Sequence, residues 1–419
     1  MGLKIASVRA VEILDSRSRP TLAVTMTVDD GRPVRAGVPS GASTGTREAV
    51  ELRDGDPARY GGKGVLTAVG HVNGDINDIL AGREFTDLAA LDQALIDLDG
   101  TDTKSRLGAN AIVGVSIAAA RAFAAVAGVP LWRYLASPTV VPRLPVPHFN
   151  VVNGGAHAPN SLDFQEFMIA PVGAPSLAEA VRAGAEVYAA LRARLAGAGH
   201  ATGLGDEGGF APDISQPEDV LAELVAAIGD AGYTPGRLGV AIALDPAASE
   251  FYRDGAYRVA GQAMSTMEMI GRYEEIAARY PVWSIEDGLA ESDWDGWAVL
   301  NERLGQRVQL VGDDILVTNP AIVADAIDRK IANAALIKVN QVGTVTETLR
   351  TMALCQQAGW AQMVSHRSGE TEDTFIADLA VGTGCGQLKT GAPARGERVA
   401  KYNRLIEIEA AEQLPYGLA

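Results

Sequence analysis

The sequence predicts an α/β protein in which a smaller N-terminal α+β domain precedes a larger C-terminal (β/α)8-type barrel. Strand-like and then helix-like segments follow one another in the first part of the chain, whereas strands and helices alternate in the rest. The alternating strands end at polar residues roughly 25 to 40 residues apart, which is typical of βα units in a barrel. With 419 residues, the chain is long enough for both domains.

Three strand-like segments and then two helix-like segments make up the first domain. Apolar and polar residues alternate in the first two strands, which predicts an antiparallel pair around the turn at 15–20. The predicted strands lie at 5–13, 22–28 and 36–38, and the Ala- and Leu-rich helices at 64–98 and 108–127. Three prolines between 137 and 145 indicate a boundary, so we expect domains 1–138 and 139–419.

Six apolar runs of the second domain each lead into a charged residue or a histidine. They lie at 239–244, 282–285, 308–312, 334–337, 363–365 and 386–388, and are followed by Asp245, Glu286, Asp313, Lys338, His366 and Lys389. Because catalysis takes place at the C-terminal ends of barrel strands, we expect these side chains to converge. Charged strand ends that merely meet solvent explain any one of them, but explain six in succession poorly. Asn319 and Pro320 predict the start of a helix.

The predicted convergence has a chemical consequence. Three carboxylates, those of Asp245, Glu286 and Asp313, cannot share a small volume unless a cation neutralises them. All-oxygen ligands suit Mg²⁺, Ca²⁺ or Mn²⁺. Lys338 and Lys389 facing these acids would complete an acid/base site, since burial and a neighbouring cation lower the pKa of a lysine.

Two loops carry further candidates. Residues 203–208 match G-x-G-x-x-G, but a helix-like segment precedes them and Glu207 would repel a pyrophosphate, which argues against a dinucleotide site. Glu207 fits better as a general acid, with a plain acidic turn as the alternative. His157 lies on a second glycine-rich loop, where a lone histidine is more often structural. The guanidinium of Arg367 is suited to binding phosphate or carboxylate through two parallel hydrogen bonds.

Composition excludes several classes of protein. The net charge of −16 opposes non-specific binding to nucleic acid. Two cysteines predict neither a disulfide framework nor a zinc site. The N-terminal segment lacks a secretory pattern, and no apolar run approaches the roughly 18 residues that span a bilayer. We therefore expect a cytoplasmic protein with no membrane span and no nucleic-acid partner.

The chain resembles the enolases (phosphopyruvate hydratases), and closely the bacterial ones. The matching stretches run in family order over nearly the whole chain, and several are too long for chance agreement. They include SGASTG at 40–45, VVNGGAHA at 151–158, GDEGGFAP at 205–212, SIEDGL at 284–289, VGDDILVTN at 311–319, LIKVNQVGT at 336–344, SHRSGETEDTFIADLAVG at 365–382 and KTGAPAR at 389–395.

The resemblance implies Mg²⁺-dependent, reversible dehydration of 2-phosphoglycerate to phosphoenolpyruvate, in glycolysis and gluconeogenesis, with two Mg²⁺ per active site. The implied metal ligands are Asp245, Glu286 and Asp313 for the first ion and Ser43 for the second. The implied catalytic residues are the base Lys338 and the general acid Glu207. The implied substrate-binding residues are His157, Gln165, Glu166, Arg367, Ser368 and Lys389.

The resemblance also implies an irregular ββαα start to the barrel, a homodimer or an octamer assembled from dimers, and a fraction at the cell surface or secreted. Three stretches depart from the family pattern, at Ser18-Arg19, at Pro246 and at Ala156 with Pro159-Asn160. They leave open a diverged enzyme that acts on another phosphorylated hydroxy acid. A binding or structural protein that kept only the fold is a second alternative, against which the intact acids and lysines argue.

Overall fold

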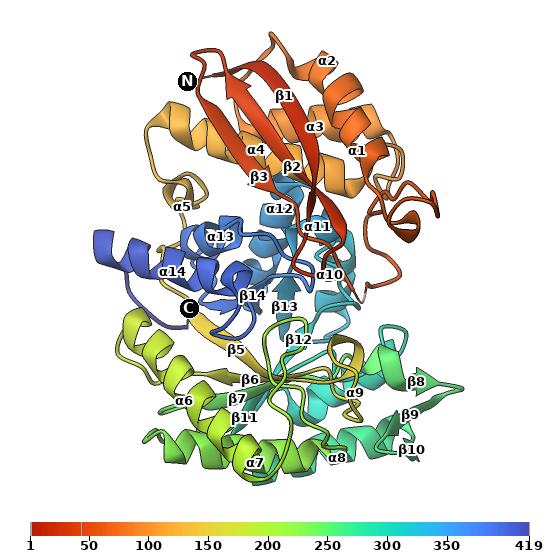
Figure 1. Ribbon diagram of the computed structural model, residues 1–419, viewed down its shortest axis with the longest axis vertical. Helices are drawn as coiled ribbons and strands as arrows, with labels where there is room; N and C mark the ends of the chain where they lie inside the picture. Colours follow the sequence, from red (N-terminus) through yellow and green to blue (C-terminus); the bar gives the residue numbers. More distant parts are fainter. Residues whose placement is uncertain (1, 43, 419) are drawn as a thin grey trace.

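Figure 1 shows two units, an N-terminal sheet with its helices and a barrel surrounded by helices. This computed structural model describes residues 2–42 and 44–418. Its eight-stranded closed barrel and smaller N-terminal sheet confirm the predicted fold class. Ser43, the expected contact of a second metal ion, lies outside the described residues.

The N-terminal unit is built on a four-stranded sheet in the order β3-β2-β1-β4. Its strands are β1 (Leu3–Leu14), β2 (Pro20–Val28), β3 (Pro33–Gly37) and β4 (Glu84–Phe85), and its helices are α1 (Leu66–His71), α2 (Asn77–Leu80), α3 (Leu88–Asp99), α4 (Ala109–Ala127) and α5 (Leu131–Tyr134). β1 and β2 pair antiparallel, as the alternation predicted. Val8, Val24 and Met26 are fully buried, because they lie on the face that the helices cover.

The single helix predicted over 64–98 is wrong, because this segment is divided. α1 runs into a π-helical turn at Val72–Ile76 before α2, and Gly82 at φ +75° turns the chain into β4. Asn73 and Asn77 on this stretch accept hydrogen bonds from the backbone N–H groups of β1 at 2.8 and 2.9 Å. The irregular turn therefore brings two amides to the part of β1 that lies beyond its short pairing with β4 and needs partners.

The expectation that no apolar run approaches the length of a membrane span is wrong for the α4 helix, which has 19 residues. By length and composition it could cross a membrane, but 83% of its apolar window is buried inside the protein. Gly114 allows close packing, since a Cβ there would come within 2.6 Å of the Val24 side chain. Its burial against β2 is that of a core helix.

The barrel closes in the order β11-β12-β13-β14-β15-β5-β6-β7. Its strands are β5 (Val146–Asn153), β6 (Glu166–Ala170), β7 (Ala241–Asp245), β11 (Val282–Glu286), β12 (Gln309–Gly312), β13 (Ala334–Ile337), β14 (Ala361–Ser365) and β15 (Gln387–Lys389). β6 runs antiparallel to both β5 and β7, and the other pairs are parallel.

Helices cover the barrel on the outside (Figure 1). They are α6 (Leu177–Gly197), α7 (Pro217–Asp230), α8 (Thr266–Arg279), α9 (Trp294–Leu304), α10 (Pro320–Asp328), α11 (Val339–Val342), α12 (Val345–Gln357), α13 (Phe375–Thr383) and α14 (Gly396–Ala411), with a small sheet of β8 (Tyr252–Arg253), β9 (Ala256–Val259) and β10 (Gln262–Met264). The order β5-β6-α6-α7-β7 is the ββαα start that the resemblance implied. Asn319 caps α10 as predicted, accepting from two backbone N–H groups.

The segment between α5 and β5 joins the two units, and we propose that the domains divide there, at residues 138 and 139. Polar contacts hold the units together across this division. Arg121 of α4 forms a two-bond ion pair with Asp373 at 2.6 and 2.7 Å. Asp92 of α3 accepts hydrogen bonds from the backbone N–H and the hydroxyl of Thr346, at the start of α12.

The turn at 15–20 keeps its contacts with the barrel despite its departure from the family pattern. Ser18 adopts φ +59°, so the position retains a left-handed backbone although it is not glycine. Asp15 accepts hydrogen bonds from the N–H groups of Arg17 and Arg19 at 2.8 and 2.9 Å. The Ser16 N–H donates to the carbonyl of Glu370 in the barrel at 2.8 Å.

Burial raises the pKa of Asp92 from 3.8 to about 6, although its hydrogen bonds with Thr346 and Ser116 oppose the shift. The folded protein then binds this proton more tightly than the unfolded chain, so the contribution of Asp92 to stability falls as the pH rises from about 4 to about 6. A shift of this size corresponds to roughly 3 kcal/mol. We expect Asp92→Asn, which has no proton to lose, to gain about that much relative to wild type between pH 4 and pH 7.

Urea unfolding of both proteins across this pH range measures the difference. Asp97→Asn is the matched control, because Asp97 lies on the same helix and is exposed. A difference between wild type and Asp92→Asn that stays constant with pH would contradict the expectation.

Candidate active site

The predicted strand-end residues converge at the C-terminal mouth of the barrel. Asp245, Glu286 and Lys389 are the last residues of β7, β11 and β15, and Asp313 and Lys338 directly follow β12 and β13. One pocket there is lined by nine of the predicted site residues: His157, Gln165, Glu166, Glu207, Asp245, Lys338, Arg367, Ser368 and Lys389. Glu286 and Asp313 join the group through their ion pairs with the two lysines.

Lys389 lies at the centre of three carboxylates. Its Nζ is 2.7 Å from Glu286 Oε1, 3.0 Å from Asp245 Oδ2 and 3.1 Å from Glu166 Oε2, and its side chain is 2% exposed. Burial alone would lower the pKa of Lys389, but these acids outweigh it and raise that pKa well above its ordinary value. Lys389 therefore remains a fixed positive charge.

Lys338 is paired with a single acid. Its Nζ is 2.5 Å from Asp313 Oδ2, and the other oxygen of Asp313 accepts a hydrogen bond from Gln341 at 2.8 Å. Burial would lower the pKa of Lys338, but the Asp313 carboxylate raises it above the ordinary lysine value. Asp287 fixes this segment by accepting from the backbone N–H groups of Asp313 and Asp314 at 2.8 and 2.9 Å.

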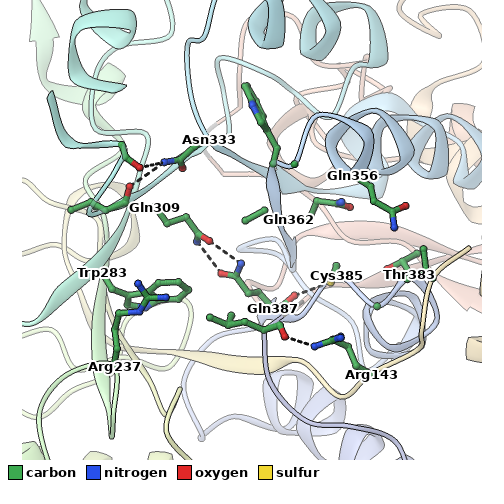
Figure 2. A pocket seen from close by; sticks show the side chains of 18 of the residues that line it. Arg143, Arg237, Trp283, Gln309, Asn333, Gln356, Gln362, Thr383, Cys385 and Gln387 are labelled. Atoms are coloured by element: carbon green, nitrogen blue, oxygen red, sulfur yellow. Dashed lines mark hydrogen bonds between the residues drawn. The ribbon is translucent and has the colours of Figure 1, made fainter. Parts of the chain in front are cut away.

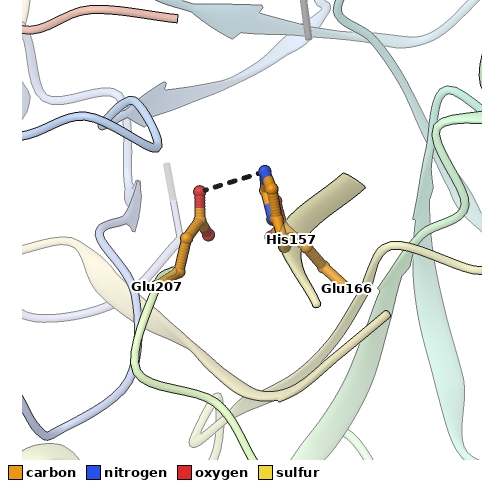
Figure 3. Close-up of side chains that lie close together, drawn as sticks. All are labelled: His157, Glu166 and Glu207. Carbon is orange, nitrogen blue, oxygen red and sulfur yellow. Dashed lines mark ion pairs between the residues drawn. The ribbon is translucent and has the colours of Figure 1, made fainter. Parts of the chain in front are cut away.

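Figure 3 shows His157 lying between two carboxylates. Its Nδ1 is 3.7 Å from Glu166 Oε1 and its Nε2 is 3.7 Å from Glu207 Oε1, while the Ser368 hydroxyl is 2.8 Å from Nε2. All three members of this group are buried. They come from loops after β5 and before β7 and from the first residue of β6, segments that only the barrel closure brings together.

His366 decides which member of the Glu166–Glu207 pair carries a proton. Burial lowers the pKa of His366 to about 3, so its imidazole is neutral. Arg398 can only donate, and it lies 2.6 Å from Nδ1, so the proton of His366 is on Nε2, which is 3.0 Å from Glu207 Oε2.

The two carboxyl groups consequently titrate far apart. Burial alone would raise the pKa of Glu207, but His366 and His157 face its oxygens and hold that pKa well below its ordinary value. Burial and the Glu207 charge raise the pKa of Glu166 well above its ordinary value. These opposite shifts favour Glu166 over Glu207 as the member of the pair that binds a proton.

Arg367 lies where the N-terminal unit meets the barrel mouth. Its guanidinium forms a two-bond ion pair with Glu48, at 3.0 and 3.1 Å, and donates to the Asn340 side chain at 3.0 Å. Glu48 belongs to the loop after β3, so this contact connects the N-terminal unit to the site. Burial would lower the pKa of Arg367, but Glu48 raises it, and the guanidinium is charged.

Several buried polar atoms in the site have no hydrogen-bond partner among the residues that the structure describes. They include Gln165 Oε1, Glu286 Oε2 and His157 Nδ1. Buried polar groups in native proteins are normally satisfied, so such a concentration indicates a place for a ligand. Burial and the Asp245 charge also raise the pKa of Glu286 well above its ordinary value, which a cation beside it would reverse.

Two groups of acids and histidine bring their ligand atoms within 4.8 Å of one another, and each could hold a metal ion. They are His157 with Glu166 and Glu207, and Asp287 with Asp313 and Asp314. The predicted set of Asp245, Glu286 and Asp313 is not one of these groups, because the lysines separate its members. Its carboxylates still end adjacent strands and offer only oxygen ligands, which suit Mg²⁺.

The sequence analysis missed three side chains of the site and assigned no role to a fourth, His366, although it expected that strand-end residue to converge with the others. Asn150 donates to Glu207 Oε2 at 2.9 Å, and His366, Glu48 and Asn340 make the contacts given above. For His366 a signal existed, since it follows a predicted barrel strand. Asn150 lies inside a strand that was not predicted, and Glu48 lies in the other domain, so neither carried a local signal.

The remaining departures from the family pattern leave the local bonding intact. Pro246 has no N–H, but the next residue, Ala247, donates its own N–H to Asp245 Oδ1 at 2.9 Å. In the loop after His157, the Asn160 amide donates to the carbonyls of Asn153 and Pro212 at 2.9 and 3.0 Å. Both Asp245 and the loop after His157 are therefore held by hydrogen bonds.

Comparison with known proteins agrees with this geometry. A family model described as "Enolase, C-terminal TIM barrel domain" matches residues 141–416, and one described as "Enolase, N-terminal domain" matches residues 5–135. A protein named enolase from Rubrobacter xylanophilus is 58% identical over 408 residues, 97% of this chain and 94% of that protein. Another, from Acidothermus cellulolyticus, is 58% identical over 405 residues with the same coverage. The chain therefore belongs to the enolase family, and it is a hydro-lyase of the phosphopyruvate hydratase type.

Proposed function

We propose that this protein catalyses the Mg²⁺-dependent, reversible dehydration of 2-phosphoglycerate to phosphoenolpyruvate, as a step of glycolysis and gluconeogenesis in the cytoplasm. One observation carries the proposal: Lys338 and Lys389 face three acids at the barrel mouth, with the Glu166–Glu207 pair beside them. Removal of a C2 proton and departure of a hydroxide need a base and an acid in one closed site, and this arrangement supplies both.

The substrate is an anion with a phosphate and a carboxylate. We assign the phosphate to Arg367 and Ser368, because a guanidinium binds phosphate in a two-bond fork. The phosphate would take the place of the Glu48 carboxylate, which now occupies that fork. Gln165 and His157 offer unpaired buried polar atoms to the rest of the substrate, and Lys389 provides a fixed positive charge.

We assign Asp245, Glu286 and Asp313 as the ligands of one Mg²⁺ and Ser43 as a contact of a second. When bound, Mg²⁺ supplies positive charge for the negative charge that develops on the substrate carboxylate. Binding of an ion by Asp313 would also withdraw that carboxylate from Lys338. Since this acid is what raises the pKa of Lys338, its withdrawal lets Lys338 lose its proton and act as the C2 base.

We assign Glu207 as the acid that protonates the departing 3-hydroxyl. Hydroxide is a poor leaving group, so its departure needs a proton donor on the side opposite the base. The Glu166–Glu207 pair supplies this proton, which rests on Glu166 and reaches Glu207 when substrate changes the charges around the pair. His366 and Asn150 hold Glu207 in position.

The diverged enzyme with another phosphorylated hydroxy acid as substrate is the remaining alternative. An assay that follows phosphoenolpyruvate formation from 2-phosphoglycerate with and without Mg²⁺ separates the two, because only the proposed function requires turnover. For the assembly we propose a homodimer or an octamer assembled from dimers, to be measured by light scattering in solution.

Lys338→Ala removes the proposed base. We expect kcat to fall by about 10²- to 10⁴-fold and exchange of the C2 proton with solvent to stop, whereas Mg²⁺ binding changes little. NMR of 2-phosphoglycerate in deuterated buffer follows the exchange. Lys63→Ala, an exposed lysine of the N-terminal unit, is the control. Exchange at the wild-type rate in Lys338→Ala would exclude Lys338 as the base.

Glu207→Gln removes the proposed acid and keeps its shape. We expect formation of phosphoenolpyruvate to fall by about 10²-fold or more while the C2 proton still exchanges, because acid and base are different groups. The exposed Glu302→Gln is the control. If exchange and dehydration fall together in a folded variant that binds Mg²⁺, separate roles for Glu207 and Lys338 are wrong.

The metal assignment predicts different effects for two neighbouring acids. Glu286→Gln removes a proposed ligand, and we expect the Mg²⁺ concentration that stabilises the protein to rise about tenfold or more. Asp314→Asn serves as the contrast, because Asp314 belongs to the other acidic group, with Asp287 and Asp313. Melting temperatures across an Mg²⁺ titration measure both. If the stabilising Mg²⁺ concentration rises more in Asp314→Asn than in Glu286→Gln, the ion binds to that other group and not to Glu286.

A further inference from the structure

A second cavity lies at the opposite end of the barrel from the active site. Its volume is about 660 Å³, which lies within the usual range for small-molecule sites. It is lined by residues at or just before the N-terminal ends of β5, β11, β12, β13, β14 and β15 (Figure 2). Nothing in the proposed reaction uses this end of the barrel.

The cavity carries positive charge and no described acidic lining residue. Arg143, Arg237 and Arg307 line it, and none of them forms an ion pair with a residue that the structure describes. Arg237 and Arg307 are exposed, so their charges are available to a ligand. Arg143 donates to the carbonyl of Leu418, and no described acid pairs with any of the three. In a chain with a net charge of −16, such a cavity favours anions.

The walls also offer flat rings and unused amides. Arg237 lies over the Trp283 ring, 5.5 Å from its centroid, as Figure 2 shows. Trp360 provides a second, partly exposed indole. The Gln362 side chain, 9% exposed, and the indole N–H of Trp283 make no hydrogen bond with any described residue. Such walls suit a planar group that has donors and acceptors on its edge.

A pair of glutamines separates this cavity from the catalytic residues. Gln309 and Gln387 exchange two amide hydrogen bonds of 2.9 Å across the barrel interior, and Gln309 also donates to Ser284. Gln387 lies two residues before Lys389 on one strand, so the two side chains share a face at different depths. The cavity is therefore a site of its own and not an extension of the active site.

We propose that this cavity binds a nucleoside phosphate, with the phosphate on the arginines and the base against the tryptophan and amide walls. The charge of the arginines requires an anionic ligand. A bare phosphate would leave the indole rings and the amides of the cavity without contacts. A nucleoside monophosphate is small enough for the cavity volume, and it combines the two chemistries in one molecule.

Isothermal titration calorimetry with AMP, without Mg²⁺, tests the proposal on the intact chain. We expect one saturable site per chain, and binding weakened by about tenfold or more in Arg237→Gln/Arg307→Gln. Arg192→Gln/Arg350→Gln is the charge-matched control, because both arginines are exposed, neither lines the cavity, and neither forms an ion pair with a described residue. Arg367→Gln, which alters the proposed phosphate site of the active site, is expected to retain AMP binding.

Adenosine and inorganic phosphate separate the contributions of base and phosphate. Both are expected to bind about tenfold or more weaker than AMP. The proposal is overturned if AMP does not bind at millimolar concentration, if phosphate binds as tightly as AMP, or if the control loses as much affinity as the double variant. Loss of AMP binding in Arg367→Gln would assign the binding to the active site instead.

Discussion

The charge of Lys389 is the feature on which the mouth of this barrel depends. Three carboxylates from three different strands lie within 3.1 Å of one buried ammonium group. Without it, burial of Glu166, Asp245 and Glu286 together would be prohibitive, because each charge loses water and repels the others. The strands must therefore end in register around Lys389, and the positions of the other site residues follow from that register.

The N-terminal unit completes this site. Glu48 holds Arg367, Arg121 pairs with Asp373, and the turn at Asp15 and Ser16 contacts the segment after β14. These contacts are polar and specific, and they fix the position of one unit relative to the other. The unit thus contributes Glu48, the acidic partner of Arg367, next to the active-site pocket.

Much of this arrangement could be predicted from the sequence, for physical reasons. Barrel strands are short apolar runs, and the topology places the residue at the end of each run at the mouth of the barrel. The spacing of these runs in the sequence therefore identified Asp245, Glu286, Asp313, Lys338 and Lys389. The roles of His157, Gln165 and Glu166 came only from the resemblance to a family, because loop residues such as His157 show no periodic pattern and β6, which begins at Glu166, was not predicted as a strand.

The rest depended on tertiary contacts. The interruption of the helix over 64–98 was not predicted, because its cause is not local. It places two asparagine side chains where they bond to the backbone of β1, a strand some 65 residues earlier in the chain. Asn150 was hidden in an irregular strand, and Glu48 reaches its partner from another domain. The protonation of the Glu166–Glu207 pair depends on the tautomer of His366, which Arg398 sets from a distant helix.

With the substrate phosphate placed on Arg367 as proposed, the ion pair between Glu48 and Arg367 makes substrate binding an exchange of one anion for another. The phosphate would gain two charge-assisted hydrogen bonds only after the same two bonds to a carboxylate are given up. The affinity would then be a difference between two similar free energies, so a singly charged anion would gain nothing by entering. The protein's own carboxylate thereby sets a threshold of charge that separates the substrate from the abundant weaker anions of the cell.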